Sequence, residues 1–301
     1  MINFNVRNNI VDHPDFVAAQ SAIEELHGWQ RESGEMSGLA LVGPSGSGKS
    51  TVLKGYRDQF PAHEELIRRV IPTLYVEVPS APTVKSLAEA ILLAMGAAIP
   101  PGSTGARLTE CIVTLVEACG VELIFLDEFQ HFADGAKRRL LEVSDWLKGL
   151  LNRLQVSVVL AGLPSLLRVL EVNQQLRRRF SRVVRLRPFS TANKPDIGTF
   201  VGVAKALMTD MPLPCANLDQ IGFIQQLHFA TGGLVDYMCK IIGGAYRIAA
   251  SRKAHFIDVS DFAKAFHVYI WDEAVPSRDP FHKKFNGIPL TQAGEPFSEV
   301  L

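Results

Sequence analysis

A lysine and a serine at the end of a glycine-rich loop are the residues of this sequence best suited to phosphate chemistry. Residues 43–50 read Gly-Pro-Ser-Gly-Ser-Gly-Lys-Ser and fit the spacing G-x-x-x-x-G-K-[ST]. Glycines let successive backbone N–H groups turn toward phosphate oxygens, and the helix expected next adds its own unpaired N–H groups. Lys49 would reach the β- and γ-phosphates of a nucleoside triphosphate, and the Ser50 hydroxyl would bind Mg²⁺. The predicted nucleotide-binding residues are Gly43, Pro44, Ser45, Gly46, Ser47, Gly48, Lys49, Ser50 and Thr51.

Two acids directly follow an apolar segment further along the chain. Residues 121–126 are almost all apolar, as in a parallel strand covered on both faces, and Asp127 and Glu128 come next. Asp127 would lie at the carboxyl end of this strand, beside the glycine loop, and position Mg²⁺. Glu128 would polarise an attacking water, so the pair predicts hydrolysis of ATP with Mg²⁺ as cofactor.

Alternating strand and helix signals must position these residues. Strands are predicted at 38–42, 73–78, 121–126, 156–161 and 182–186, with helices between them. This order is typical of a three-layer α/β sandwich around a parallel sheet. After Pro188 the strand signals stop, and helices are predicted near 193–208, 217–229, 232–250 and 258–271. We expect an N-terminal arm at 1–14, a P-loop ATPase domain at 15–188, a small all-helical lid at 189–271 and a flexible tail at 272–301.

The composition is that of an ordinary globular protein. Of 301 residues, 47% are hydrophobic and 21% are charged, and 31 basic side chains balance 31 acidic ones. Any contact with nucleic acid must therefore come from a local basic surface. The cysteines lack metal-ligand spacing, no apolar run approaches the ~20 residues of a membrane span, and the N-terminus lacks a signal-peptide pattern. We expect a soluble, cytoplasmic protein without a membrane partner.

The two motifs and the helical lid resemble the AAA+ ATPases. Within that class, residues 119–132 (Cys-Gly-Val-Glu-Leu-Ile-Phe-Leu-Asp-Glu-Phe-Gln-His-Phe) resemble the transposon ATPases of the TniB/TnsC group, relatives of MuB and IstB. The likeness covers roughly residues 15–270. It implies a homo-oligomer, as a ring or helical filament, that assembles on duplex DNA with ATP. It also implies two protein partners, a DDE transposase of the TniA/TnsB type and a TniQ-like adaptor.

A basic run at 177–182 resembles the segment from which AAA+ proteins supply an arginine to the γ-phosphate of a neighbouring subunit. Such an arginine neutralises charge in the transition state of phosphoryl transfer. The resemblance assigns this role first to Arg179, then to Arg182 and then to Arg178, and it requires an oligomer. The alternative is a solvated helix end with cations near its C-terminal dipole.

Two positions depart from the AAA+ pattern. The strand at 156–161 runs into Gly162, where a polar sensor residue is often found, and Asp236 stands where related proteins tend to have arginine. An acid at that position cannot pair with a phosphate. We therefore expect slow, partner-stimulated hydrolysis of ATP to ADP and phosphate, with the triphosphate acting more as an assembly signal than as a fuel.

Two segments are candidates for contacts with DNA. The turn at 102–107 resembles the region through which this ATPase group lines a DNA-facing groove, and it offers Thr104 and Arg107. A second basic segment follows the acidic motif and contains Lys137, Arg138 and Arg139. Both would contact backbone phosphates, so binding would be sequence-independent and salt-sensitive. The alternative for each is a solvated surface, and nearby Glu110 and Glu117 weaken the positive field of the first.

The sequence therefore predicts an ATP-dependent, DNA-binding regulator of transposition. It would recruit or activate the transposase and hydrolyse ATP to disassemble the complex or select its target. A replication-type helicase loader or initiator is one alternative. A nucleotide-gated scaffold with incidental hydrolysis is another, and a P-loop kinase is disfavoured by Glu128.

Overall fold

The computed structural model describes residues 4–80, 82–133, 137–215 and 218–298, with the side chains of 137–139 excepted. The chain divides into two units, which we treat separately. The sheet unit consists of residues 15–43 and 49–186. The helical unit consists of residues 1–14, 44–48 and 187–301, so it includes the middle of the glycine loop.

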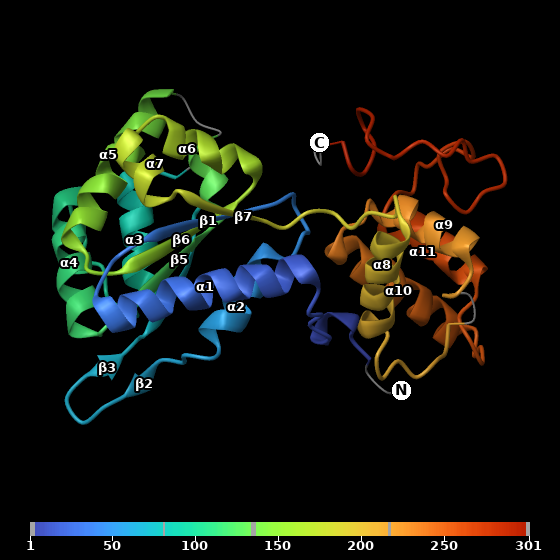
Figure 1. The fold of residues 1–301 in the computed structure, drawn as a ribbon, viewed down its shortest axis with the longest axis horizontal. Coiled ribbons are helices and arrows are strands. Elements are labelled where there is room, and N and C mark those ends of the chain that lie inside the picture. Colours follow the sequence, from blue (N-terminus) through green and yellow to red (C-terminus); the bar gives the residue numbers. More distant parts are fainter. Residues whose placement is uncertain (1–3, 81, 134–136, 216–217, 299–301) are drawn as a thin grey trace. The chain divides into compact units, whose positions relative to one another are not determined.

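A five-stranded parallel sheet forms the centre of the sheet unit (Figure 1). In spatial order the strands are β4 (Thr73–Glu77), β5 (Leu123–Asp127), β6 (Ser157–Gly162), β1 (Gly38–Val42) and β7 (Arg182–Arg185). The register places Asp127 beside Glu77 and Val42 beside Gly162. Since the carboxyl ends of parallel strands share one edge, the start of the glycine loop, Asp127 and Gly162 meet there.

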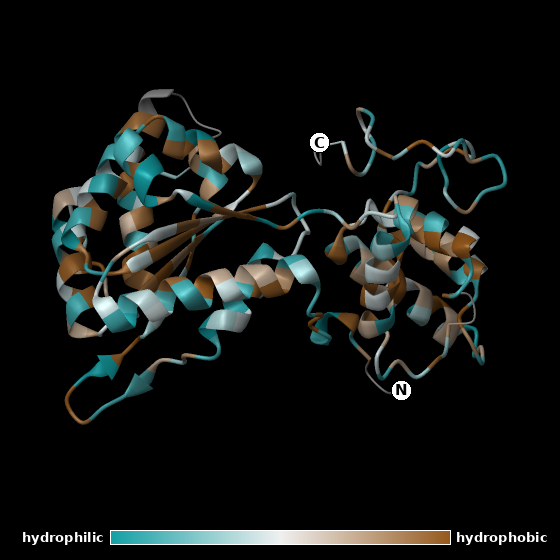
Figure 2. Cartoon of the chain, viewed as in Figure 1, coloured by the Kyte–Doolittle hydropathy of each residue, from teal (hydrophilic) through white to brown (hydrophobic). Residues whose placement is uncertain are grey.

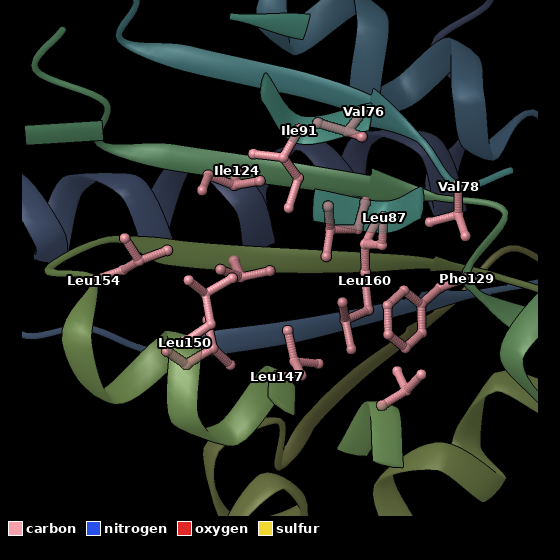
Figure 3. Close-up of a cluster of buried hydrophobic side chains, with 14 of the residues drawn as sticks. Val76, Val78, Leu87, Ile91, Ile124, Phe129, Leu147, Leu150, Leu154 and Leu160 are labelled. Atoms are coloured by element: carbon pink, nitrogen blue, oxygen red, sulfur yellow. The ribbon is translucent and has the colours of Figure 1, made fainter. Parts of the chain in front are cut away.

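Helices cover both faces of this sheet (Figure 1). One face carries α1 (Pro14–Ser33) and α2 (Lys49–Arg57); the other carries α3 (Val84–Ala94), α4 (Gly105–Ala118) and α5 (Lys137–Arg153). Side chains of β1 alternate between the layers, with Leu39 and Leu41 in one core and Ala40 and Val42 in the other. Figure 3 shows α5 leucines beside residues of the sheet in the second core. The predicted three-layer α/β fold is confirmed.

Several short elements of the sheet unit escaped the sequence analysis. They are β2 (His63–Glu64), β3 (Arg69–Val70) and the 3-10 helices η2 (Phe129–Phe132) and η3 (Pro164–Leu166). The short helices α6 (Leu167–Glu171) and α7 (Gln174–Arg179) lie between β6 and β7, where helical structure is expected. Strands β2 and β3 pair as an antiparallel hairpin whose loop exposes Leu66 and Ile67 (brown in Figure 2). The strands and 3-10 helices of this group have two to four residues and are too short to show a hydrophobic period.

In the described residues, the helical unit contains the 3-10 helix η1 (Val6–Asn8) and four α-helices, and the α-helices follow Pro188 as predicted. The helices are α8 (Lys194–Leu207), α9 (Ile221–Thr231), α10 (Val235–Ser251) and α11 (Val259–Tyr269). Val6 of η1 is buried in their common core with Phe200, Met238 and Phe266. Among the described residues, none of the helices combines the length and apolar character needed to cross a membrane.

The segment after Asp272 differs from the flexible tail expected there. Its described residues, 272–298, contain no helix or strand, but Leu290 and Phe297 are buried in the core of the helical unit. The guanidinium of Arg278 is also buried, and it donates to both carboxylate oxygens of Glu295 at 2.6 Å. A packed segment held by an ion pair leaves no periodic signal, which is why the sequence suggested flexibility.

Candidate nucleotide site

The glycine loop has the backbone that its sequence predicted. Gly46 and Gly48 have φ angles of 77° and 95°, in the left-handed region that favours glycine. Helix α2 begins at Lys49, immediately after the loop. The Ser47 hydroxyl is buried and has no hydrogen-bond partner among the described residues. An unpaired buried hydroxyl in a loop of this shape fits a phosphate ligand, since buried polar atoms normally have partners.

Lys49 lies with its ammonium group buried at the carboxyl edge of the sheet. Only 6% of the residue is exposed, and Nζ donates to the carbonyl of Gly43 at 2.9 Å. Burial lowers the pKa of the Lys49 ammonium, and the negative charges of Glu128 and Asp127 oppose that shift. A buried cation between a glycine loop and two carboxylates is suited to bind a phosphate oxygen.

Asp127 is held at the end of β5 by three donors. Its Oδ2 accepts hydrogen bonds from the Ser50 hydroxyl at 2.5 Å and the Tyr75 hydroxyl at 2.8 Å. Its Oδ1 accepts the backbone N–H of Glu128 at 2.9 Å. The two residues predicted to bind metal are therefore in contact. Hydroxyl and carboxylate oxygens are the hard ligands that Mg²⁺ prefers, so the donor set fits this ion.

Tyr75 was missed by the sequence analysis. It lies on β4, next to β5, and its hydroxyl reaches Asp127 from the neighbouring strand. Burial and the charge of Asp127 raise the pKa of the Tyr75 hydroxyl, so the group stays protonated and remains a donor. The available signal was the predicted parallel pairing of strands, which places the end of one strand beside the end of the next.

Glu128 has an unusual backbone and a side chain with a defined partner. Its φ of 57° lies in the left-handed region, where residues other than glycine are uncommon and often functional. Its Oε2 accepts a hydrogen bond from Nε2 of Gln130 at 2.5 Å. Gln130 is 4% exposed, and its Oε1 accepts the backbone N–H of Leu163 at 3.1 Å. The sequence analysis did not single out Gln130.

The three candidate arginines differ in their surroundings. Arg179 ends α7 and is half-buried, and this burial lowers the pKa of its guanidinium. Arg178, its neighbour, is exposed. Arg182 begins β7, where it is exposed and donates to Glu25 of α1 at 2.7 Å. Of the three arginines, Arg179 is therefore the least exposed to solvent. Arg182 already has an acidic partner within the chain.

Asp236 is part of an ion cluster in the helical unit. It lies in the first turn of α10, and its backbone N–H donates to the carbonyl of Gly46 at 3.1 Å. Its carboxylate pairs with Arg7 at 2.5 Å and with Lys240 at 2.8 Å. Burial alone would raise the pKa of Asp236, but the hydrogen bonds from Lys240 and Arg7 lower it. The sequence shows an acid where related proteins tend to have arginine, but it does not show the two cations that pair with this acid.

The candidate DNA contacts are only partly described. Thr104 caps the N-terminus of α4, where its hydroxyl accepts the backbone N–H of Arg107 at 3.3 Å, and both side chains are exposed. Glu110, one turn further along, pairs with Arg153 at 2.6 Å, which offsets its negative charge. The side chains of Lys137, Arg138 and Arg139 lie outside the described residues.

Comparisons with known proteins agree with this geometry. The model of the family described as "Bacterial TniB protein" matches residues 2–191. No curated protein matches the chain. The solved structure of Cdc6 from Pyrobaculum aerophilum is similar with a TM-score of 0.63 at 14% identity, covering 88% of this chain and 69% of that one.

Two further solved structures share the fold. ORC2 of Aeropyrum pernix, in ADPNP–ADP complexes, gives a TM-score of 0.62 at 13% identity, with 88% of this chain and 69% of that chain covered. The RuvB Holliday junction branch migration motor of Thermotoga maritima gives 0.52 at 13% identity, with 84% and 68% covered. At such identities the likeness concerns the fold alone, which is the α/β AAA+ P-loop fold.

Proposed function

This chain belongs to the bacterial TniB family, and from that membership and the geometry of its site we propose that it binds and hydrolyses ATP with Mg²⁺ in the control of DNA transposition. One observation carries the proposal. The hydroxyl of Ser50, at the end of the glycine loop, lies 2.5 Å from Oδ2 of Asp127, at the end of β5. Both groups lie at the edge of the sheet where Lys49 is buried. A phosphate loop, a metal-binding pair and a second acid are thereby combined.

Each residue has a defined part in the proposed reaction. Backbone N–H groups of the loop and the Lys49 ammonium bind the phosphates. Ser50 and Asp127 would hold Mg²⁺, which would neutralise negative charge on the phosphates. A water oxygen attacks the γ-phosphorus while the bond to the β–γ bridging oxygen breaks. Glu128 accepts the proton of the water, and ADP and inorganic phosphate leave.

Oligomerisation would complete the site. We propose Arg179 as the residue that reaches the γ-phosphate of a neighbouring copy, with Arg182 as the second candidate after release from Glu25. Duplex DNA would be bound through Thr104, Arg107, Lys137, Arg138 and Arg139, and the partners would be a TniA/TnsB-like transposase and a TniQ-like adaptor. Because Asp236 occupies the place of a phosphate-binding arginine, we propose that hydrolysis is slow and stimulated by partners.

The substitution Glu128→Gln tests whether the proposed function depends on hydrolysis of ATP. The variant should bind ATP and assemble on DNA, but its rate of phosphate release should fall by about 10²- to 10⁴-fold, the typical contribution of a general base. Glu77→Gln is the matched control, because Glu77 is an exposed acid at the same edge of the sheet. If Glu128→Gln supports target choice and insertion indistinguishable from wild type, the scaffold alternative replaces the hydrolytic one.

A further inference from the structure

Position 162 lacks a side chain because another residue fills its space. A Cβ atom at Gly162 would lie 2.2 Å from Oε1 of Gln130, closer than any side chain tolerates. Gly162 ends β6 next to β1, and its carbonyl accepts the N–H of Gly43 at 3.2 Å. The carboxamide of Gln130 thus lies at the end of β6 beside the first residue of the glycine loop.

The orientation of this carboxamide is fixed by its partners. Oε1 accepts the backbone N–H of Leu163, and that contact requires the oxygen on this side. Nε2 must then face Glu128, where it donates to Oε2. With 4% of the residue exposed, neither contact is readily replaced by water. One buried amide therefore links the backbone after β6 to the acid after β5.

Glu128 needs such a partner for a local reason. Its left-handed backbone turns the chain directly into η2, and its charge lies close enough to Lys49 to affect the pKa of that ammonium. A carboxylate free to rotate would be drawn toward the buried cation. The donor on Gln130 holds Oε2 instead, at the end of the strand that carries Asp127.

We propose that Gln130 is the positioning residue for Glu128, and that it supplies from the segment after β5 the polar group that position 162 lacks. The inference rests on the proposed hydrolysis of ATP. It also changes the interpretation of Gly162. This glycine leaves space for the amide of Gln130, so the absence of a polar side chain at position 162 does not remove a polar group from the site.

Gln130→Met removes both hydrogen bonds and keeps a side chain of similar length. We expect kcat for ATP hydrolysis to fall about 10- to 100-fold, as for other residues that orient a functional group, while KM for ATP changes less than about twofold. Gln225→Met, at an exposed glutamine of α9, is the matched control and should hydrolyse ATP as wild type does. Wild-type kcat in a folded Gln130→Met protein would overturn the inference.

An amide placed at position 162 should restore the activity that is lost when the amide at position 130 is removed. Gln130→Ala should lose activity in the same way, and Gly162→Asn in that background should recover at least about tenfold in kcat, because its carboxamide enters the vacated space. The 3.1 Å approach of the new Cβ to the backbone nitrogen of residue 130 requires a shift of a few tenths of an ångström. A folded double variant no faster than Gln130→Ala would contradict the proposal.

Stability gives a second readout that does not depend on turnover. Gly162→Ala alone should lower the melting temperature, and the same change should be tolerated in Gln130→Ala, since the clashing oxygen is gone. Equal losses in both backgrounds would contradict the proposed packing. If wild type releases no phosphate and Glu128→Gln changes nothing, the proposed function fails together with this inference. Loss of activity in Glu128→Gln but not in Gln130→Met removes only the inference.

Discussion

Two aspartates contact the glycine loop, and they differ in the charge of the groups that hold them. Asp127 reaches Ser50 in the sheet unit, is 1% exposed, and is held by two hydroxyls and a backbone N–H. Asp236 reaches Gly46 in the helical unit, has a quarter of its side chain exposed, and is held by Arg7 and Lys240. Neutral donors fix Asp127 without cancelling its charge, which stays available to a metal ion. Cationic donors neutralise Asp236.

This difference explains how an acid is tolerated beside a phosphate loop. An isolated carboxylate near Gly46 would repel a triphosphate, but Asp236 carries two cations on its oxygens. The cluster as a whole has one excess positive charge. Asp236 therefore organises Arg7 and Lys240 near the loop. The same residue type is thus proposed to bind a metal ion in one unit and holds two cations in the other.

The largest effect should come from removing the charge of Asp127. Asp127→Asn keeps the size of the side chain but loses the anion, so Mg²⁺ should increase the affinity for ATP much less. We expect the Mg²⁺-dependent gain in affinity to fall by about 10²-fold or more, since a carboxylate is a principal ligand of this ion. Binding of a fluorescent ATP analogue with and without Mg²⁺ measures this. An unchanged dependence on Mg²⁺ would remove Asp127 from the metal site.

Removing one of its donors should have a smaller effect. Tyr75→Phe deletes only the hydroxyl that binds Oδ2 of Asp127, so the carboxylate keeps its charge but loses part of its orientation. We expect apparent Mg²⁺ affinity in the ATPase assay to fall about 10-fold, the lower end of the range for groups that orient metal ligands. Tyr246→Phe, on α10 in the helical unit, is the control. Equal Mg²⁺ titrations for Tyr75→Phe and wild type would show that the other two donors suffice.

The smallest effect should come from Asp236→Asn. Its ion pairs are partly exposed, so we expect a loss of only about 0.2–1 kcal/mol in unfolding free energy at pH 7. Since the pKa of Asp236 is lowered in the folded protein, this contribution is present above the unfolded pKa and disappears as pH falls through the folded value. Chemical denaturation of wild type and variant from pH 7 down into the acid range measures it. A difference that persists at the lowest pH would contradict an electrostatic origin.

Asp236→Asn should also affect nucleotide binding in the opposite direction to Asp127→Asn. Arg7 and Lys240 are released from their acid, so ATP affinity should stay the same or rise a few-fold. Arg7→Gln is the informative companion, because it removes one cation and leaves Lys240 paired with Asp236. If Asp236→Asn weakens ATP binding as strongly as Asp127→Asn does, the contrast between the two aspartates is wrong.

The parts of the fold and site that follow local patterns could be predicted from the sequence. The glycine loop, the acids after β5 and the strand–helix alternation each depend on neighbours within a few residues. Tyr75, Gln130 and Arg7 could not be found in this way, because their partners are set by strand pairing or by packing. Arg7 and Asp236, for example, are 229 residues apart in sequence, and they meet because the N-terminal segment packs on the helical unit, where Val6 is buried.

Two departures from the AAA+ pattern each involve a group that lies far away in the sequence. At Gly162 and Asp236 the sequence shows which group is absent from the position, but not what enters the space. The amide of Gln130 fills the first position, and two cations surround the second. Both compensations come from residues that no local rule connects to the site.

The most direct test compares Asp127→Asn and Asp236→Asn in one assay of phosphate release with Mg²⁺, ATP and duplex DNA. Both changes replace a carboxylate that contacts the glycine loop by an amide of the same size. We predict that Asp127→Asn loses at least about 10²-fold in rate, whereas Asp236→Asn stays within a few-fold of wild type. Similar rates for the two variants would contradict the claim that Asp127 alone supplies the metal-binding charge.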